Sequence, residues 1–171
     1  MTRYYLLLLC CSLFVFIGFA QKPDSVWILA DLQTKRLSPQ SFPALPQSIR
    51  NYLEQHHYSI PQDYYDTIPH NVLFGHFANK KNRDIAILCS FNRVSSIIIF
   101  WNVKIDSISE ISKSPDLDWL QGVGGDNIGF SRIINIIRYD DHDGIDDYFD
   151  GKYSIIYYYN KGQWSEFQGA D

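Results

Sequence analysis

The sequence predicts an α+β fold, mainly an antiparallel β meander with one N-terminal amphipathic helix packed on the sheet. Three observations predict it: apolar residues recur at helical spacing in an early segment, β-branched and aromatic runs of strand length follow, and short polar turns separate these runs. A helix on one face of a sheet buries the apolar surfaces of both. Hydrophobic residues make up 46% of the chain and aromatic residues 16%, which is enough for one packed domain.

The first twenty residues are typical of a cleavable export signal. Arg3 supplies an early positive charge, Tyr4–Phe19 is uncharged and apolar, and Gly18 and Ala20 are small residues at the positions that a signal peptidase must accommodate. We expect cleavage after Ala20 and an extracytoplasmic domain, periplasmic or secreted, of roughly 150 residues. The alternatives are an uncleaved anchor, since the run is close to the shortest that spans ~30 Å of hydrocarbon, and a lipoprotein modified at an early cysteine.

The composition argues against several classes of partner. Removing Arg3 with the signal changes the formal charge from -4 to about -5, and no basic cluster is denser than Lys80–Arg83. An acidic surface repels phosphate backbones, so we expect no nucleic-acid partner, and no membrane span after signal removal. The mature chain keeps only Cys89, so an internal disulfide is impossible. Its apolar, strand-like setting favours a buried structural thiol.

The first part of the mature chain contains a poorly defined segment and then the predicted helix. Residues 21–42 form a poorly defined N-terminal segment in which Val26–Leu29 could be a short strand, and residues 43–171 form the single β-rich domain. Pro46–His57 is predicted as the amphipathic helix because its apolar residues recur at helical spacing and proline suits a first helical turn. His56 and His57 fall at its C-terminal end, where a capping role is favoured over metal ligation.

A series of strands follows the loop Ser59–Pro69, which is rich in tyrosine, aspartate and proline. The predicted strands are Asn71–Phe77, Asp84–Phe91, Ser95–Val103, Arg132–Tyr139 and Tyr153–Tyr159. The run at Ile97–Trp101 reads as a central strand. Gln121–Asp126 is predicted as a mobile loop whose glycines form turns, and Asn160–Gly162 as a hairpin turn.

An acidic segment near the C-terminus is the candidate for chemistry. Six of the nineteen acidic residues fall within Asp140–Asp150, a density that is costly unless water or a cation screens it. Asp141, Asp143 and Asp147 stand in the pattern D-x-D-G-x-x-D, and Gly144 permits the positive backbone angle of a tight turn that would direct these carboxylates to one centre. Calcium is the predicted ion, since it prefers oxygen ligands and tolerates irregular geometry.

This acidic segment and the strand that follows it resemble the calcium-binding hairpins of FG-GAP and VCBS-type repeats, which build extracellular β-propellers and adhesion modules. Asp141, Asp143 and Asp147 match three ligand positions of the pattern D-x-[DN]-x-D-G-x-x-D, Gly144 matches the turn, and Tyr139 occupies the first ligand position. The resemblance implies a calcium ion held by the three aspartates.

A second segment, Gly75–Ile87, resembles the same repeat in its strand-turn-strand outline. Its ligand positions include Lys80, so no calcium is expected there, and the lysine ammonium could take the place of the ion. The two segments are compatible with two units of one supersecondary type, too few to close a propeller. The whole chain is also similar to uncharacterised secreted bacterial proteins that end in an HDG-I-x-D loop and a final Gly-Ala-Asp, here residues 169–171.

Two other interpretations of the acidic segment stay open. It could be a solvated turn whose aspartates bond backbone amides, since turn chemistry alone enriches aspartate and glycine. It could also contribute catalytic carboxylates. His142 alternates with the proposed ligands and is expected to point outward.

The favoured function is a noncatalytic exported module that binds an unknown protein or an envelope or surface partner, with calcium stiffening one hairpin. Four tryptophans and twelve tyrosines could supply the contact surface, although aromatic residues also fill cores. The alternative is a small extracytoplasmic hydrolase that uses the carboxylates of the acidic segment and a metal-activated water. No Gly-x-Ser-x-Gly stretch supports a serine nucleophile.

Overall fold

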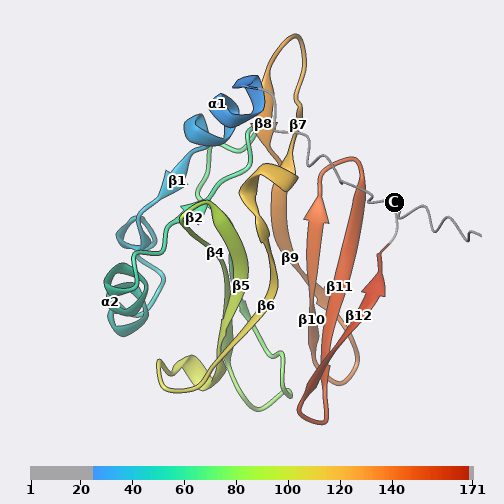
Figure 1. The fold of residues 1–171 in the computed structure, drawn as a ribbon. Helices are drawn as coiled ribbons and strands as arrows, with labels where there is room; N and C mark the ends of the chain where they lie inside the picture. Colours follow the sequence, from blue (N-terminus) through green and yellow to red (C-terminus); the bar gives the residue numbers. More distant parts are fainter. Residues whose placement is uncertain (1–24, 170–171) are drawn as a thin grey trace, which may run out of the picture.

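The computed structural model describes residues 25–169, and the predicted export signal lies outside them. The chain has an α+β fold made mostly of antiparallel sheets, as predicted. Two four-stranded sheets face each other, and helix α2 (Gln47–Gln55) covers the outer face of the first sheet (Figure 1). The molecule therefore has three layers: helix, sheet and sheet.

Each large sheet is a meander. The first has the order β3-β4-β5-β6 and the second the order β12-β11-β10-β9, with every neighbouring pair antiparallel. The strands of the first sheet are β3 (Val72–Gly75), β4 (Asp84–Phe91), β5 (Val94–Phe100) and β6 (Ile108–Pro115). Those of the second are β9 (Arg132–Arg138), β10 (Asp143–Phe149), β11 (Tyr153–Asn160) and β12 (Gln163–Gln168). The five predicted strands are confirmed within a few residues at each end, and β10 is a strand where a loop was expected.

The β11–β12 turn confirms the predicted hairpin. Lys161 and Gly162 have φ angles of 48° and 88°, both in the left-handed region. Two consecutive residues of this kind make the type of two-residue turn whose twist suits antiparallel strands.

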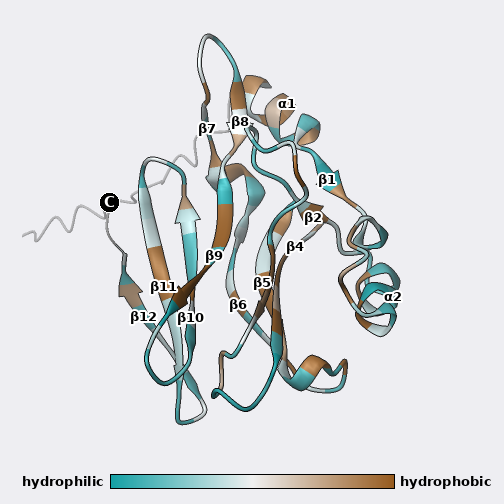
Figure 2. Cartoon of the chain, turned by 180° about the vertical axis from the view of Figure 1, so that it is seen from behind, coloured by the Kyte–Doolittle hydropathy of each residue, from teal (hydrophilic) through white to brown (hydrophobic). Residues whose placement is uncertain are grey.

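The first sheet is buried on both faces. Ala86 and Leu88 of β4 face the second sheet, whereas Ile87 and Cys89 face α2, because successive side chains of a strand point to opposite faces. This double burial explains the continuous apolar runs Ile85–Cys89 in β4 and Ile97–Phe100 in β5, and Figure 2 colours the chain by hydropathy. The interpretation of Cys89 as a buried thiol is confirmed, and its burial raises the pKa of the thiol well above the usual value.

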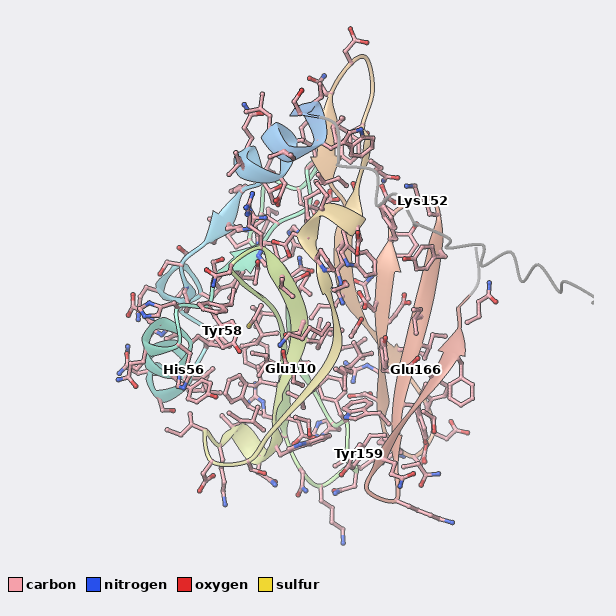
Figure 3. All side chains as sticks on the ribbon, viewed as in Figure 1. His56, Tyr58, Glu110, Lys152, Tyr159 and Glu166 are labelled. Atoms are coloured by element: carbon pink, nitrogen blue, oxygen red, sulfur yellow. The ribbon has the colours of Figure 1, made fainter. Side chains whose placement is uncertain are left out.

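Helix α2 confirms the helix predicted over Pro46–His57. Ile49 and Leu53 are fully buried against the first sheet. His56 follows the last helical residue, and its Nδ1 lies 2.7 Å from the Tyr52 carbonyl oxygen, so the capping role is confirmed for His56. Figure 3 shows His56 at the outer edge of the helical layer.

The prediction of a strand at Val26–Leu29 is wrong, because these residues belong to helix α1 (Ser25–Gln33). A short apolar run suits either structure, and here the helix places Trp27 and Ala30 against the core between the sheets. No helix within residues 25–169 has the length and apolar character needed to cross a membrane.

The rest of the N-terminal segment also belongs to the fold. β1 (Arg36–Leu37) pairs with β2 (Ile60–Pro61), and a short 3-10 helix η1 (Pro39–Ser41) leads to α2. The Arg36 guanidinium joins α1 to the sheets: Nη1 donates to the Asp31 carbonyl oxygen at 2.8 Å, and Nε donates to Asp116 Oδ2 at 3.0 Å. This network fixes α1 at one end of the molecule.

A small hairpin lies beside α1. It consists of β7 (Leu120–Gly122) and β8 (Ile128–Phe130), and two further 3-10 helices, η2 (Trp101–Val103) and η3 (Asp116–Trp119), connect the strands before it. The predicted mobile loop is thus partly a hairpin. Gly124 and Gly125 have positive φ angles, which confirms them as turn formers. Figure 1 shows this hairpin projecting past the ends of the sheets next to α1.

Candidate functional site

The acidic segment, Asp140–Asp150, is a hairpin strand rather than a tight loop. β10 begins at Asp143 and pairs with both β9 and β11. Gly144 therefore adopts strand geometry and is not among the residues with positive φ, so the expected turn at this glycine is wrong. A Cβ at Gly144 would lie 3.0 Å from the Tyr139 ring and 3.2 Å from the Tyr157 carbonyl oxygen. Close packing against Tyr139 and the Tyr157 backbone therefore explains why residue 144 is a glycine.

Asp147 forms a fully buried ion pair between the sheets. Arg132 Nε donates to Asp147 Oδ1 at 2.8 Å and Nη2 donates to Oδ2 at 2.7 Å, with both side chains at 0% exposure. The Ser112 hydroxyl also donates to Oδ2. Arg132 donates further to Ser95 Oγ and lies 4.1 Å from the Trp119 ring. Both carboxylate oxygens of Asp147 thus have charged donors.

Asp143 has a different set of partners. Arg138 Nη1 lies 2.8 Å from both of its oxygens, and the His76 backbone N–H donates to Oδ2 at 2.8 Å. The Asp143 N–H in turn donates to the His76 carbonyl oxygen at 2.9 Å. Asp143 therefore links the turn after β3 of the first sheet to β10 of the second.

Asp141 lies on the surface beside His142. Its side chain is 66% exposed, and its Oδ2 accepts a hydrogen bond from the Tyr158 hydroxyl at 2.5 Å. This bond lowers the pKa of Asp141, while burial and the same bond raise the pKa of Tyr158 to about 12. The expectation that His142 points outward is wrong: its ring is buried against Tyr158, and Nε2 lies 2.6 Å from the Tyr159 carbonyl oxygen.

The structure does not bring the three predicted ligands together. Asp143 and Asp147 are four residues apart in one strand, so their Cα atoms are separated by roughly 13 Å at the usual rise per residue. Among residues 25–169, no group of three or more histidine, cysteine or acidic side chains is gathered around a common point. Calcium binding by Asp141, Asp143 and Asp147 stays a prediction, and it would require a different arrangement of this hairpin.

The second repeat-like segment uses its aspartate internally as well. Asp84 is fully buried, and its Oδ2 accepts from the backbone N–H groups of Phe77 and Ala78 at 3.0 and 3.3 Å. Its Oδ1 accepts from the Asn102 N–H at 2.8 Å. Lys80 is exposed at the turn. Asp84 thus closes the turn between β3 and β4.

A cavity lined by an aspartate with one unpartnered oxygen lies at the α1 end of the molecule. It has a volume of about 160 Å³ and lies between the end of α1, the segment that follows β2, and β8. Its walls include Ala30, Thr34, Asp63, Tyr64, Ile128 and Phe130. The cavity therefore combines apolar, aromatic and acidic side chains from three segments that are distant in sequence.

The loop Gln62–His70 is held closed by the side chains at its two ends. Gln62 Nε2 donates to the His70 carbonyl oxygen at 3.2 Å, and the His70 N–H donates to Gln62 Oε1 at 2.9 Å. The Asp63 N–H donates to His70 Nε2 at 3.0 Å, which leaves Nδ1 to carry the ring proton. The Tyr65 hydroxyl donates to the Val123 carbonyl oxygen at 2.6 Å and ties the loop to the β7–β8 hairpin. Asp63 is thus presented by a closed loop with fixed ends.

Asp63 and Asp66 are acidic residues of this cavity, and one oxygen of Asp63 lacks a partner. The residue is 4% exposed, and Oδ2 accepts from the Tyr65 N–H at 2.8 Å. Oδ1 is buried without a hydrogen-bond partner. Burial raises the pKa of the Asp63 carboxyl, the charge of Asp66 raises it further, and the hydrogen bond from Tyr65 lowers it. A buried oxygen of this kind costs free energy until a donor reaches it.

Tyr64 approaches the β8 backbone very closely. A Cβ at Gly129 would lie 2.5 Å from the Tyr64 Cβ, so only glycine permits this approach. The Tyr64 N–H also donates to the Phe130 carbonyl oxygen at 2.8 Å. Gly129 therefore sets the position of Tyr64 at the cavity wall.

Sequence reasoning did not identify this site. The sequence pattern predicts Ser59–Pro69 only as a loop rich in tyrosine, aspartate and proline. Its single available signal is an Asp-Tyr-Tyr-Asp stretch between two prolines, in which two adjacent aromatic rings lie between two carboxylates. The burial of Asp63 depends on α1 and β8, which no local pattern places beside the loop.

Comparison with known proteins adds no family to this description. No protein-family model matches the chain, and neither the curated proteins nor the solved structures include a significant match.

Proposed function

We propose that the chain is a noncatalytic exported binding module whose contact surface lies at the end formed by α1, the Gln62–His70 loop and the β7–β8 hairpin. One observation carries the proposal. Within residues 25–169, seven of the twelve large apolar side chains that are exposed come from α1 and this loop. They are Val26, Ile28, Leu29, Leu32, Tyr64, Tyr65 and Ile68. We name these seven residues the apolar end.

Exposed apolar side chains that gather in two neighbouring segments are typical of protein contact sites. α1 contacts β8, and the cavity lies between α1 and the loop, so the two segments adjoin each other. Tyr64 and Tyr65 meet edge to face at 5.4 Å, which adds rigid aromatic area. Five other exposed apolar side chains are spread over the strands and turns.

The partner that fits this end best is a protein with a basic contact surface. The carboxylates of Asp63 and Asp66 line the cavity beside the apolar end, and the whole chain is acidic. Acidic side chains next to an apolar surface attract a partner of opposite charge and repel anionic lipid headgroups.

Photocrosslinking from single positions tests the proposal. A photoreactive side chain is placed at Leu32, and a second at Phe167 of β12, which is exposed on the far sheet. We expect a discrete protein adduct from position 32 in intact cell envelope, and none from position 167. Leu29→Ser should weaken that adduct several-fold, whereas Phe167→Ser should not, although the two side chains are 53% and 54% exposed. Lipid adducts alone, or equal adducts from both positions, would contradict the proposal.

The hydrolase stays the alternative. It is tested by a screen of hydrolytic substrates with the native chain. Turnover that is lost in Asp143→Ala while the fold survives would replace our proposal.

A further inference from the structure

We propose that the Asp63 cavity binds a protonated primary amine, the end of a lysine side chain that the protein partner inserts when it docks on the apolar end. The inference rests on the proposed function, and it goes further because it assigns a ligand chemistry to one buried carboxylate. Three observations carry it: the unpartnered oxygen, the charges around the cavity, and its size and lining.

The unpartnered oxygen defines what the ligand must supply. Asp63 Oδ1 is buried and accepts no hydrogen bond, while Oδ2 already accepts from Tyr65. Nearly all buried polar atoms in folded proteins have a partner. The missing partner is a donor, so the ligand carries N–H or O–H groups. A charged donor forms the stronger bond with a carboxylate.

The charged groups around Asp63 favour a positively charged ligand in the cavity. Asp66 lines the same cavity, and Asp150 is close enough for its charge to act on the Asp63 carboxyl. Lys35 also lines the cavity, and His70 accepts from the Asp63 backbone N–H through Nε2 while its Nδ1 lies 3.4 Å from Asp66 Oδ2. The carboxylates of Asp63, Asp66 and Asp150 outnumber Lys35 and His70 even when His70 is protonated, so the local field favours a positive ligand.

The size and lining favour an alkylammonium end over a metal ion or a whole cofactor. A volume of about 160 Å³ is below the roughly 300–1,000 Å³ of pockets that enclose drug-sized ligands, and it suits one end group. Apolar contacts from Ala30 and Ile128 suit a methylene chain. The Tyr64 ring in the wall offers the aromatic contact that ammonium groups favour. Calcium would need six to eight oxygen ligands instead.

The first test is calorimetric titration of the full mature chain at pH 7.5 with n-butylamine, which imitates the lysine end, and with n-butanol as its neutral counterpart. We expect saturable binding of the amine and none of the alcohol. Asp63→Asn keeps the shape of the side chain and should weaken amine binding at least ~10-fold, because it removes a charge-assisted hydrogen bond. Glu166→Gln removes an equivalent charge on β12, away from α1 in Figure 3, and should leave binding unchanged. Equal affinity in Asp63→Asn and wild type would overturn the proposal.

A second measurement keeps the proposal testable where Asp63→Asn does not fold. Amide NMR signals of the wild-type chain are followed during the same titration, and we expect the largest shifts at Tyr64, Tyr65 and Gly129. Shifts confined to other acidic segments, such as Asp140–Asp150, would overturn the assignment.

A third arm separates the two sources of a primary amine. A capped tripeptide with lysine between two leucines should bind more tightly than n-butylamine, because its leucines reach the apolar end. Tighter binding of n-butylamine would mean that the cavity takes a free small amine, and would overturn the assignment to a partner side chain. Failure of both amines while the adduct from position 32 persists would overturn this inference and leave the proposed function standing.

Discussion

The acidic hairpin Asp140–Asp150 and the Gln62–His70 loop differ in the partners of their most buried carboxylates. In the hairpin, Asp143 and Asp147 are buried and each faces an arginine. In the loop, Asp63 is equally buried but has one oxygen without a donor. The hairpin also has one buried oxygen without a hydrogen-bond partner, Asp146 Oδ1, so the contrast with Asp63 holds for the two aspartates that pair with arginine and not for the hairpin as a whole. A binding site is indicated by an unmet hydrogen-bonding requirement beside a cavity, as at Asp63, more than by the density of charge.

The largest expected effect comes from breaking the buried pair in the second sheet. Arg132→Met leaves Asp147 ionised and without its charged donors, so we expect the free energy of unfolding to fall by about 3–5 kcal/mol. Denaturant titration measures this. Arg138→Met is the matched control: its side chain is 67% exposed and pairs with Asp143, so its loss should cost less than about 1 kcal/mol. Equal losses in both variants would refute the contrast between the two pairs.

The next effect concerns the wall of the cavity. Gly129→Ala would force a methyl group against Tyr64, and overpacking of this kind costs about 1–3 kcal/mol. Gly122→Ala in the partner strand β7 meets no atom within 4 Å and is the control. We expect Gly129→Ala to lower both stability and amine affinity, and Gly122→Ala to change neither. Unchanged amine binding in Gly129→Ala would show that the position of Tyr64 does not contribute to amine binding.

A smaller effect is expected in the pH dependence of stability. The pKa of Asp63 is raised in the folded chain, chiefly by burial, so the folded state holds this proton to higher pH than the unfolded state does. The resulting stabilisation is complete below the ordinary aspartate pKa and is lost as pH rises through the folded value. As pH rises across this window, wild type loses this contribution to the free energy of unfolding and Asp63→Asn has none to lose. The difference in free energy of unfolding between wild type and Asp63→Asn should therefore shrink as pH rises. Parallel curves would show that Asp63 is not desolvated.

The smallest expected effect is that of calcium. Binding at Asp147 would compete with Arg132, so we expect a dissociation constant no tighter than about 1 mM. At 1 mM calcium such a site adds RT ln 2, about 0.4 kcal/mol, and raises Tm by only ~1–2 °C relative to chelator-treated protein. Thermal melts with calcium and with chelator measure the difference. A rise of ~10 °C that is lost in Asp143→Asn would make the hairpin a calcium site and would remove the contrast with the loop.

Much of the fold was predictable because local pattern and tertiary environment agree. The central run Ile85–Cys89 of β4 is continuously apolar because both of its faces are buried, and the predicted bounds of β4 are those observed. α2 was predictable because Ile49 and Leu53 repeat at helical spacing and face the sheet. α1 was not, since its apolar residues surround the helix and some of them are exposed, so no periodicity distinguishes it from a strand.

The sites were harder to predict because their decisive contacts are distant in sequence. The D-x-D-G-x-x-D pattern predicts converging carboxylates only when the backbone turns, and pairing with β9 and β11 extends it instead. The partner of Asp147, Arg132, lies on a neighbouring strand, and sequence reasoning treated it only as the start of that strand. Asp63 is buried only because α1 and β8, which are distant in sequence, enclose it.

Carbon-13 NMR titration of the Asp63 carboxyl, with and without saturating n-butylamine, tests the central claim most directly. We predict a pKa above the usual aspartate range in the free chain, and a marked fall when the amine binds, since a cation beside the carboxylate favours its ionised form. An ordinary pKa in the free chain, or one that the amine does not change, would contradict the claim that Asp63 is a desolvated carboxylate awaiting a cationic donor.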